Sequence, residues 1–308
     1  MEHLIDFKDY TEEKFNRIID RAIDIKKNPE QYYDSLIHKK LYLLFEKTST
    51  RTALSFSLAI AELGGTYFLQ NWEDTNFTVG EYRDEVQYVG RNVDVIMARL
   101  KKNATLREFA KYSLVPVING CCDMFHPSQI LADMMTVKEL FGTYQVKMLY
   151  IGVWNNVLNS LAEALPFLGG ELYCMTPIIN EASMDEITLS RARQTGRLHE
   201  LDPKMSYEEF KSIVNQMDIL YTDSWVDMEF FNNPEFQEMK EIRIKTMLPY
   251  QINKELLKES KAIVLHDMPM HADYEISREV IEENKKYILQ QAENRRHAEK
   301  GLLYEMLK

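Results

Sequence analysis

The chain has 308 residues, of which 45% are hydrophobic, and its acidic residues outnumber its basic ones by 48 to 37. This length and apolar content are enough for two domains of ordinary size. The formal net charge of −11 argues against a broad surface for nucleic acid or for an anionic membrane. No apolar run reaches the ~18 residues of a membrane span, and the acidic segment 1–10 does not resemble a signal peptide. We therefore expect a cytoplasmic protein.

Short apolar segments alternate with helical patterns along the chain. The first helix is predicted to begin at Thr11, because apolar residues recur from there at helical spacing until Asn28 and Pro29 end it. The predicted strands are Leu41–Phe45, Thr66–Leu69, Val93–Ala98, Val115–Ile118, Val146–Val153, Leu172–Met175, Asp218–Thr222 and Ala262–Leu265. The predicted helices among them include Thr52–Leu63, Ser128–Phe141, Asn156–Leu168 and Ser206–Gln216.

This alternation predicts an α/β fold with two domains, each a parallel sheet flanked by helices. We place the boundary near the end of the helix Ser128–Phe141. The last helical pattern, Lys285–Leu307, has no strand after it, so we expect it to return to the first domain. The predicted domains are 1–138 plus 285–308, and 139–284.

Five strand ends or helix starts are unusually polar, and they fall where a parallel sheet binds its ligands. In the segment Ser49–Thr52, hydroxyls, backbone N–H groups and a guanidinium converge at a helix start, which suits an anion. Arg99 ends an apolar strand, so an anion or an acidic side chain must face it. The other polar segments are His126–Gln129, Tyr221–Met228 and His266–Pro269.

Together with Ala292–Arg295, the order and spacing of these segments resemble the aspartate/ornithine carbamoyltransferase family, and its ornithine-like branch more closely. The resemblance runs from about Leu41 to the end of the chain. It implies an enzyme that transfers the carbamoyl group of carbamoyl phosphate to a small amine or amino acid. It further implies a homotrimer with sites at subunit interfaces, and no cofactor or metal.

The resemblance also assigns the carbamoyl phosphate site. Attack of an amine on the carbonyl builds negative charge on its oxygen, which positioned donors stabilise. Arg51 and His126 are implied as these donors, and Gln129 is implied to bind the carbamoyl amide. The segment His266–Pro269 resembles a family loop whose backbone carbonyls meet that amide, which implies a cis Met268–Pro269 bond. The residues assigned to carbamoyl phosphate are Ser49, Thr50, Arg51, Thr52, Arg99, His126, Gln129, Met268, Pro269 and Arg295.

The amine should lie across the cleft between the domains. The segment Ile151–Leu161 lacks the glycines of a dinucleotide loop and resembles an amine-binding segment of the family. Asp227 and Asp267 stand where the family has a serine and a cysteine, so the pocket would hold as many as three carboxylates. We therefore expect a cationic amine, with ornithine a poor substrate. The residues assigned to the amine are Asn156, Asp223, Asp227, Met228 and Asp267.

Other departures from the family pattern leave the function open. Ala53 replaces a supporting arginine, Asn76 stands in place of a histidine that reaches a neighbouring subunit, and Trp154 makes one pocket wall bulky. The alternative function is therefore a homologue that has lost catalysis and serves as a binding or regulatory subunit. The retained polar residues of the carbamoyl phosphate site favour the enzyme.

Each assignment also has a structural alternative. The hydroxyls of Ser49–Thr52 and the amides of Asn155 and Asn156 could simply cap helices. Arg295 lies in a charged helical pattern that by itself predicts a solvated face. Asp227 or Asp267 could turn away to cap a helix or pair with a lysine. A metal site at the histidines and aspartates of 266–273 is disfavoured, because their spacing matches no metal motif.

Overall fold

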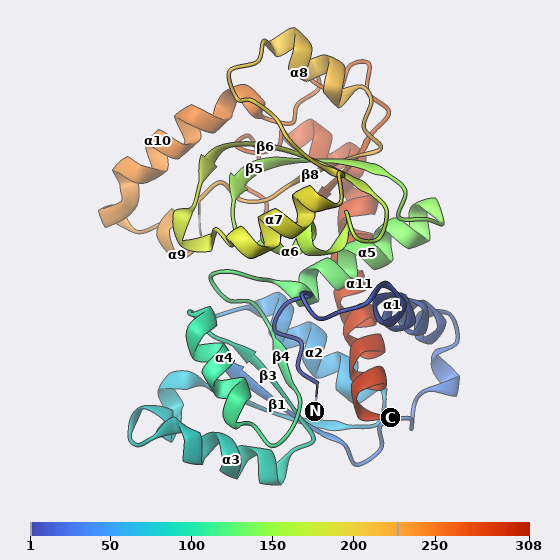
Figure 1. Ribbon diagram of the computed structural model, residues 1–308, viewed down its shortest axis with the longest axis vertical. Coiled ribbons are helices and arrows are strands. Elements are labelled where there is room, and N and C mark those ends of the chain that lie inside the picture. Colours follow the sequence, from blue (N-terminus) through green and yellow to red (C-terminus); the bar gives the residue numbers. More distant parts are fainter. Residues whose placement is uncertain (1, 227) are drawn as a thin grey trace. The chain divides into compact units, whose positions relative to one another are not determined.

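The protein divides into two compact units in the computed structural model, which describes residues 2–226 and 228–308 (Figure 1). Unit 1 comprises Met1–Leu140 and Glu293–Lys308, and unit 2 comprises Phe141–Ala292. Each unit contains one parallel sheet with helices packed on it. The predicted α/β class with two parallel sheets is confirmed, and so is the return of the C-terminal helix to the first unit.

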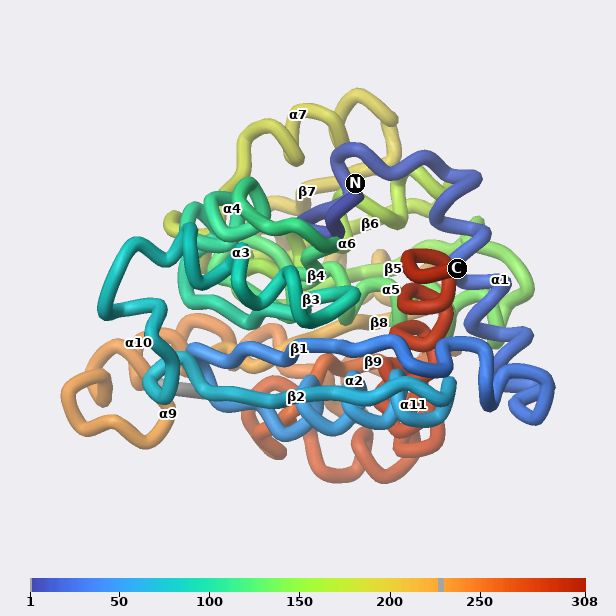
Figure 2. Tube along the Cα trace, turned by 90° about the horizontal axis from the view of Figure 1, so that it is seen from below, coloured from blue at the N-terminus to red at the C-terminus, as the bar shows by residue number. Residues whose placement is uncertain are grey.

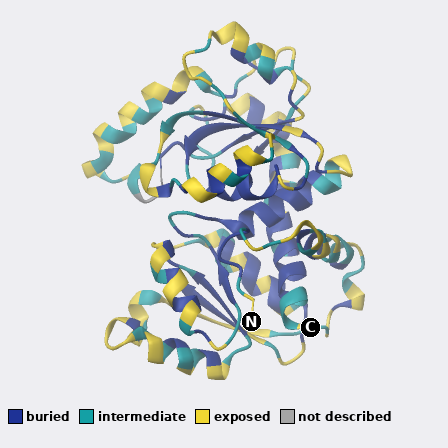
Figure 3. Cartoon of the chain, viewed as in Figure 1, coloured by how far each residue is buried: buried dark blue, intermediate teal, exposed yellow. Residues whose placement is uncertain are grey.

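Unit 1 is built on four parallel strands in the order β2-β1-β3-β4. The strands are β1 (Lys40–Phe45), β2 (Thr66–Asn71), β3 (Val95–Arg99) and β4 (Val117–Asn119). Its helices are α1 (Glu12–Lys27), α2 (Thr50–Glu62), α3 (Tyr82–Asn92), α4 (Asn103–Tyr112), α5 (Pro127–Phe141) and the second half of α11 (Arg278–Leu307). The inner strands β1 and β3 are almost continuously apolar and buried, because both faces of the sheet are covered there (Figure 3).

Strand β2 lies at the edge of this sheet and runs beside β1 (Figure 2). Almost all of its side chains are exposed, including the large apolar side chains of Tyr67, Phe68 and Leu69. An exposed apolar edge strand is a surface that proteins normally cover.

Unit 2 is built on five parallel strands in the order β7-β6-β5-β8-β9. The strands are β5 (Lys147–Trp154), β6 (Glu171–Ile179), β7 (Leu198–Glu200), β8 (Ile219–Thr222) and β9 (Ile263–His266). Its helices are α6 (Asn156–Ala164), α7 (Glu186–Gln194), α8 (Tyr207–Val214), α9 (Met228–Phe231), α10 (Gln237–Met247) and the first half of α11. No helix in the described part of the chain is both long and apolar enough to cross a membrane.

Every strand predicted from the sequence is present, with ends that differ by a few residues. The sequence does not predict β7, because Leu198–Glu200 is a short edge strand without an apolar run. The helix predicted over Asn156–Leu168 ends earlier, at Ala164, just before Leu165 and Pro166. Leu165 still has helical backbone, but Pro166 has no backbone N–H group to continue the helical hydrogen bonds.

Helix α11 packs closely against α1 through a glycine. A Cβ atom at Gly301 would lie 2.5 Å from the backbone oxygen of Ile18 and 2.8 Å from the Cβ of Ala22. Glycine therefore lets the two helices approach more closely than a side chain would allow. This contact seats the part of α11 that carries Arg295, whose side chain is only 2% exposed.

We expect Gly301→Ala to lower the free energy of unfolding by about 1–3 kcal/mol, because the added methyl group overlaps the backbone of α1. The overlap outweighs the ~1 kcal/mol by which alanine favours a helix over glycine. Thermal and urea unfolding measure the change. Gly80→Ala is the matched control, because no atom lies within 4 Å of its added Cβ. A Gly301→Ala protein as stable as the wild type contradicts this account of the α1–α11 contact.

Candidate active site

The first turn of α2 forms the centre of a polar cluster in unit 1. Ser49 caps the helix in an extended backbone conformation, and its Oγ accepts a hydrogen bond from the backbone N–H of Thr52 at 3.2 Å. Thr50 is exposed, Arg51 is half-buried and Thr52 is buried. The unpaired N–H groups of a first turn and the helix dipole favour an anion there. The capping role of Ser49 is thus real, and it leaves this turn open to a ligand.

Arg295 joins three helices of unit 1. Its Nη2 donates to Thr52 Oγ1 of α2 at 2.9 Å, and its Nη1 donates to Gln129 Oε1 of α5 at 3.0 Å. Because its side chain is almost fully buried, the solvated helix face suggested by the sequence pattern is wrong. Gln129 in turn donates from Nε2 to the buried Asp133 at 2.9 Å, one helical turn further on. Its oxygen keeps a second lone pair that could accept from an amide.

His126 stands among three guanidinium groups. It is 4% exposed and directly precedes α5, with its Nδ1 3.4 Å from the hydroxyl of Ser128. Burial holds the pKa of His126 well below its usual range, and the positive charges of Arg295, Arg99 and Arg51 lower it further. The imidazole is therefore neutral at physiological pH, and the three arginines converge on it.

Arg99 brings the end of β3 to this cluster. Its Nη1 donates to the carbonyl oxygen of Gly120 at 3.4 Å. The structure therefore gathers all the residues of unit 1 that the sequence assigns to carbamoyl phosphate. These residues are Ser49, Thr50, Arg51, Thr52, Arg99, His126, Gln129 and Arg295.

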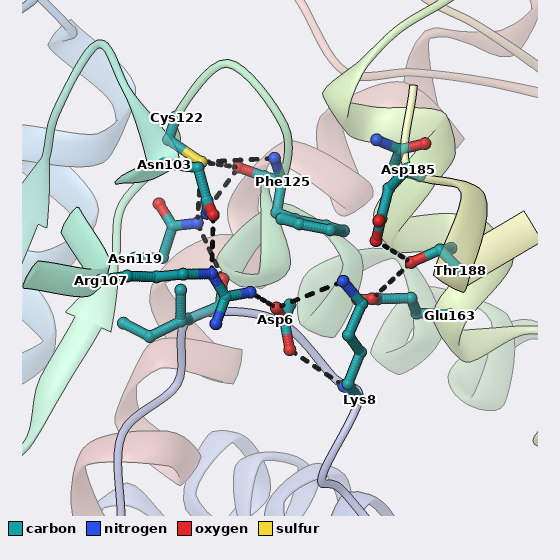
Figure 4. A network of polar contacts seen from close by, with 12 residues as sticks. Asp6, Lys8, Asn103, Arg107, Asn119, Cys122, Phe125, Glu163, Asp185 and Thr188 are labelled. Atoms are coloured by element: carbon teal, nitrogen blue, oxygen red, sulfur yellow. Dashed lines mark hydrogen bonds and ion pairs between the residues drawn. The ribbon is translucent and has the colours of Figure 1, made fainter. Parts of the chain in front are cut away.

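The loop that leads from β4 to His126 is fixed by a thiol. Figure 4 shows Cys122 contacting Asn103, Asn119 and Phe125. The side-chain amides of the two asparagines and the backbone N–H of Phe125 each lie 3.4 Å from its sulfur. All three cysteines of the chain are free thiols. Cys122 thus helps to fix the conformation of the loop that precedes His126.

In unit 2, the ends of β5 and β8 are tied together by Asn155 and Asp223. Asn155 caps α6, because its Oδ1 accepts from the backbone N–H groups of Val157 and Leu158. Its Nδ2 donates to Asp223 Oδ2 at 2.7 Å, and the backbone N–H of Ser224 donates to Asp223 Oδ1 at 2.7 Å. The sequence identifies Asn155 only as a cap and misses this contact.

Asp223 and Asp267 form a pair of neighbouring carboxyl groups. Burial raises the pKa of Asp223 well above its usual range, the negative charge of Asp267 raises it further, and the hydrogen bonds from Asn155 and Ser224 oppose the rise. Asp267 is half-buried, and its Oδ1 has no hydrogen-bond partner within the described part of the chain. Among residues 2–226 and 228–308, Asp267 neither caps a helix nor pairs with a lysine.

The segment after β9 forms the loop that the sequence predicts. The Met268–Pro269 peptide bond is cis, which confirms the prediction. The hydroxyl of Ser224 donates to the carbonyl oxygen of Pro269 at 2.9 Å, which links this loop to the end of β8. Asp227 lies outside the described residues, and so does the side chain of Met228, which begins α9.

Both ring nitrogens of His266 already have partners in unit 2. Its Nε2 lies 3.1 Å from Glu275 Oε1, and its Nδ1 accepts from the backbone N–H of Met268 at 2.7 Å. No group of three potential metal ligands occurs among residues 2–226 and 228–308. Glu275 is 1% exposed and also accepts from the backbone N–H of His271, a role that sequence reasoning misses because the acid lies in an otherwise ordinary loop.

Two other residues singled out in the sequence lie in unit 2. Asn156 is the half-buried first residue of α6. Trp154 is 2% exposed and donates from its indole nitrogen to Asn159 Oδ1 at 2.8 Å, which gives it a packing role in this unit.

Comparison with known proteins agrees with this geometry. Residues 2–139 match the model of the carbamoyl-P binding domain of aspartate/ornithine carbamoyltransferase, and residues 144–306 match the model of its Asp/Orn binding domain. The chain therefore belongs to the aspartate/ornithine carbamoyltransferase family, a family of carbamoyl-transferring enzymes.

Similar proteins of known sequence or structure are named ornithine carbamoyltransferases. The ornithine carbamoyltransferase of Methanocaldococcus jannaschii is 36% identical over 97% of both chains, and that of Methanococcus maripaludis is 37% identical over 94% of both. The solved structure of ornithine carbamoyltransferase from Pyrococcus furiosus aligns with a TM-score of 0.88 and 34% identity, covering 99% of this chain and 97% of that one. These relatives confirm the predicted family and its ornithine-like branch.

The repulsion between Asp223 and Asp267 predicts a pH-dependent gain of stability on neutralising one of them. Because the pKa of Asp223 is raised in the folded protein, its contribution to stability is lost as the pH rises through that folded-state pKa. Asp267→Asn should therefore raise the unfolding free energy by about 0.5–1 kcal/mol near pH ~8, and by much less near pH ~5. Thermal unfolding at both pH values measures the difference.

The matched control for this prediction is Glu259→Gln, which neutralises an exposed acid of the same unit. It should change the stability equally little at both pH values. A gain for Asp267→Asn that is as large at the acidic pH contradicts the assignment, because the Asp223 carboxyl group is protonated there and no like-charge repulsion remains.

Proposed function

We propose that the protein transfers the carbamoyl group of carbamoyl phosphate to the amino group of a small cationic amine or amino acid other than ornithine. The observation that carries the proposal is the convergence of Arg51, Arg99 and Arg295 on His126 beside the first turn of α2. Three guanidinium groups near one buried imidazole, in a chain of net charge −11, make a local positive site that suits a strong anion. A phosphate group supplies two charges and several acceptors.

The reaction needs no covalent intermediate on the enzyme. The amine nitrogen attacks the carbonyl carbon, the bond from that carbon to the bridging oxygen breaks, and phosphate departs with the electron pair. The proton lost by the amine passes to a phosphate oxygen. The carbonyl oxygen becomes negative during attack, and donors already in position stabilise that charge.

Arg51 and His126 are the proposed donors to the carbonyl oxygen. A neutral imidazole carries one N–H donor, so His126 can donate while its low pKa keeps it from competing for the proton of the amine. In this proposal Ser49, Thr50, Thr52, Arg99 and Arg295 hold the phosphate. Gln129 and the carbonyl groups of Met268 and Pro269 hold the carbamoyl amide.

Asp223 and Asp267 support a cationic amine. Two neighbouring carboxylates repel each other unless a cation or a shared proton lies between them. An ammonium group of the substrate would relieve that repulsion and would find the unpartnered oxygen of Asp267. The proposed amine site also includes Asn156, Asp227 and Met228.

The proposal includes a homotrimer with sites at subunit interfaces. Its support is the exposed apolar edge of β2, where Phe68 and Asn76 line a hollow of about 490 Å³ on unit 1. Exposed apolar patches often mark surfaces that bind other proteins, and neighbouring copies of the chain could cover this one. Light scattering on the purified protein measures the mass, and a monomer contradicts this part of the proposal.

A panel of amines tests the proposed reaction directly. Carbamoyl phosphate is supplied with aspartate, ornithine, shorter diamino acids, lysine or aliphatic diamines, and the ureido product is measured by colorimetry. We expect kcat/KM to be highest for a cationic amine other than ornithine. Asp267→Cys, alone and with Asp227→Ser, should shift the preference towards ornithine by about tenfold, because about 1.4 kcal/mol of charge-assisted binding is lost.

Arg51→Ala serves as the control for the anion half. It should weaken the binding of carbamoyl phosphate by about 2 kcal/mol and lower activity with every amine alike. A preference for aspartate, or a preference unchanged by both variants, contradicts the cationic substrate. No product with any amine contradicts carbamoyl transfer and favours a homologue that only binds.

A further inference from the structure

A fully buried carboxyl group lies next to the proposed phosphate site. Glu299 of α11 is 0% exposed. Its Oε1 lies 3.7 Å from Nη2 of Arg295, which precedes Glu299 by one helical turn. Neither of its oxygens has a hydrogen-bond partner of ordinary geometry in the described part of unit 1. Glutamate is almost never fully buried unless it is paired. The reaction proposed above makes no use of this residue.

Glu299 lies beside Arg295, the arginine that links α11 to α2 and α5. Arg295 donates from Nη1 to Gln129 and from Nη2 to Thr52. Glu299 lies next to the guanidinium group beside these two contacts. A charged Glu299 offsets the positive charge of Arg295, whereas a protonated one leaves that charge free to attract an anion.

We propose that Glu299 is a positioning residue for Arg295 and that it couples anion binding in unit 1 to the uptake of one proton. The inference rests on the proposed function, because it takes the cluster of arginines to be the phosphate site. The proton comes from solvent and binds to a carboxylate oxygen of Glu299. No covalent bond other than this O–H bond forms or breaks.

The direction of the coupling follows from the charges. Burial raises the pKa of Glu299 to about 8, against the opposing influence of Arg295 and of the Ser55 hydroxyl. An anion at Arg295 adds negative charge nearby and raises that pKa further. By linkage, the anion binds more tightly to the protonated form, so affinity falls as the pH rises through the pKa of the free protein.

The other ionisable groups near this part of α11 do not produce the same dependence. The pKa of His297 is lowered to about 3 and that of His126 lies well below its usual value, so both remain neutral. Arg296 and Lys300 of α11 pair with Glu62 of α2 at 3.1 and 2.8 Å. From the other packed helices, Lys26 of α1 pairs with Glu139, and Asp133 of α5 accepts from Gln129.

Sulfate is a suitable probe, because its charge does not change over the range of interest. Its affinity for the full-length protein is measured by calorimetry between pH ~6.5 and ~9.5 in two buffers of different ionisation enthalpy, which also counts the protons taken up. We expect the affinity of the wild type to fall about threefold to tenfold across this range, with proton uptake near pH ~8. Glu299→Gln mimics the protonated side chain and should bind sulfate equally well at every pH, without proton uptake.

Glu293→Gln on the exposed side of the same helix is the matched control and should retain the pH dependence of the wild type. Sulfate binding with the same pH dependence in Glu299→Gln overturns the role of Glu299 and leaves the phosphate site standing. Absence of proton uptake by the wild type overturns it as well, even if the variant fails to fold. Absence of sulfate binding at any pH overturns both the phosphate site and the inference built on it.

Discussion

The mutual repulsion of three guanidinium groups is the constraint on which the rest of unit 1 depends. Arg51, Arg99 and Arg295 come from α2, β3 and α11, and all three act on the imidazole of His126. Such a cluster survives only where its surroundings hold each group in place. The hydrogen bonds from Arg295 to α2 and α5 hold its side chain in place, and the close packing of α11 against α1 at Gly301 holds the helix that carries it. If the cluster binds an anion as proposed, its residues are already held in place, which reduces the cost of binding.

The polar cluster of unit 1 could be located from the sequence because most of its residues sit at the ends of apolar strands and at helix starts. Those positions place side chains at one edge of a parallel sheet irrespective of detail elsewhere. Arg295 is assigned to this cluster only by the family resemblance, since its charged neighbours by themselves suggest a solvated surface. Its burial depends on contacts between helices far apart in the chain, and local periodicity carries no information about them.

The amine half shows the opposite situation. Its distinctive residues lie in loops after β8 and β9, whose conformations depend on particular hydrogen bonds rather than on periodicity. Asn155, Ser224 and Glu275 help to fix this half, yet the sequence shows Asn155 only as a helix cap and does not reveal the contacts of Ser224 and Glu275. The substitution of acids in a loop framed in this way changes the charge of the site without changing the framework. This is the kind of change by which one fold comes to serve different substrates.

The passage of α11 through both units has a consequence for how the protein is made. The helix begins in unit 2 and contributes its last turns, from Glu293 onward, to unit 1. A chain emerging from the ribosome therefore carries the whole sheet of unit 1 long before it carries Arg295. Until synthesis reaches that residue, Thr52 and Gln129 lack the arginine that joins them. The cluster of Thr52, Gln129 and Arg295 is therefore completed only late in synthesis, after the sheet of unit 1 has been made.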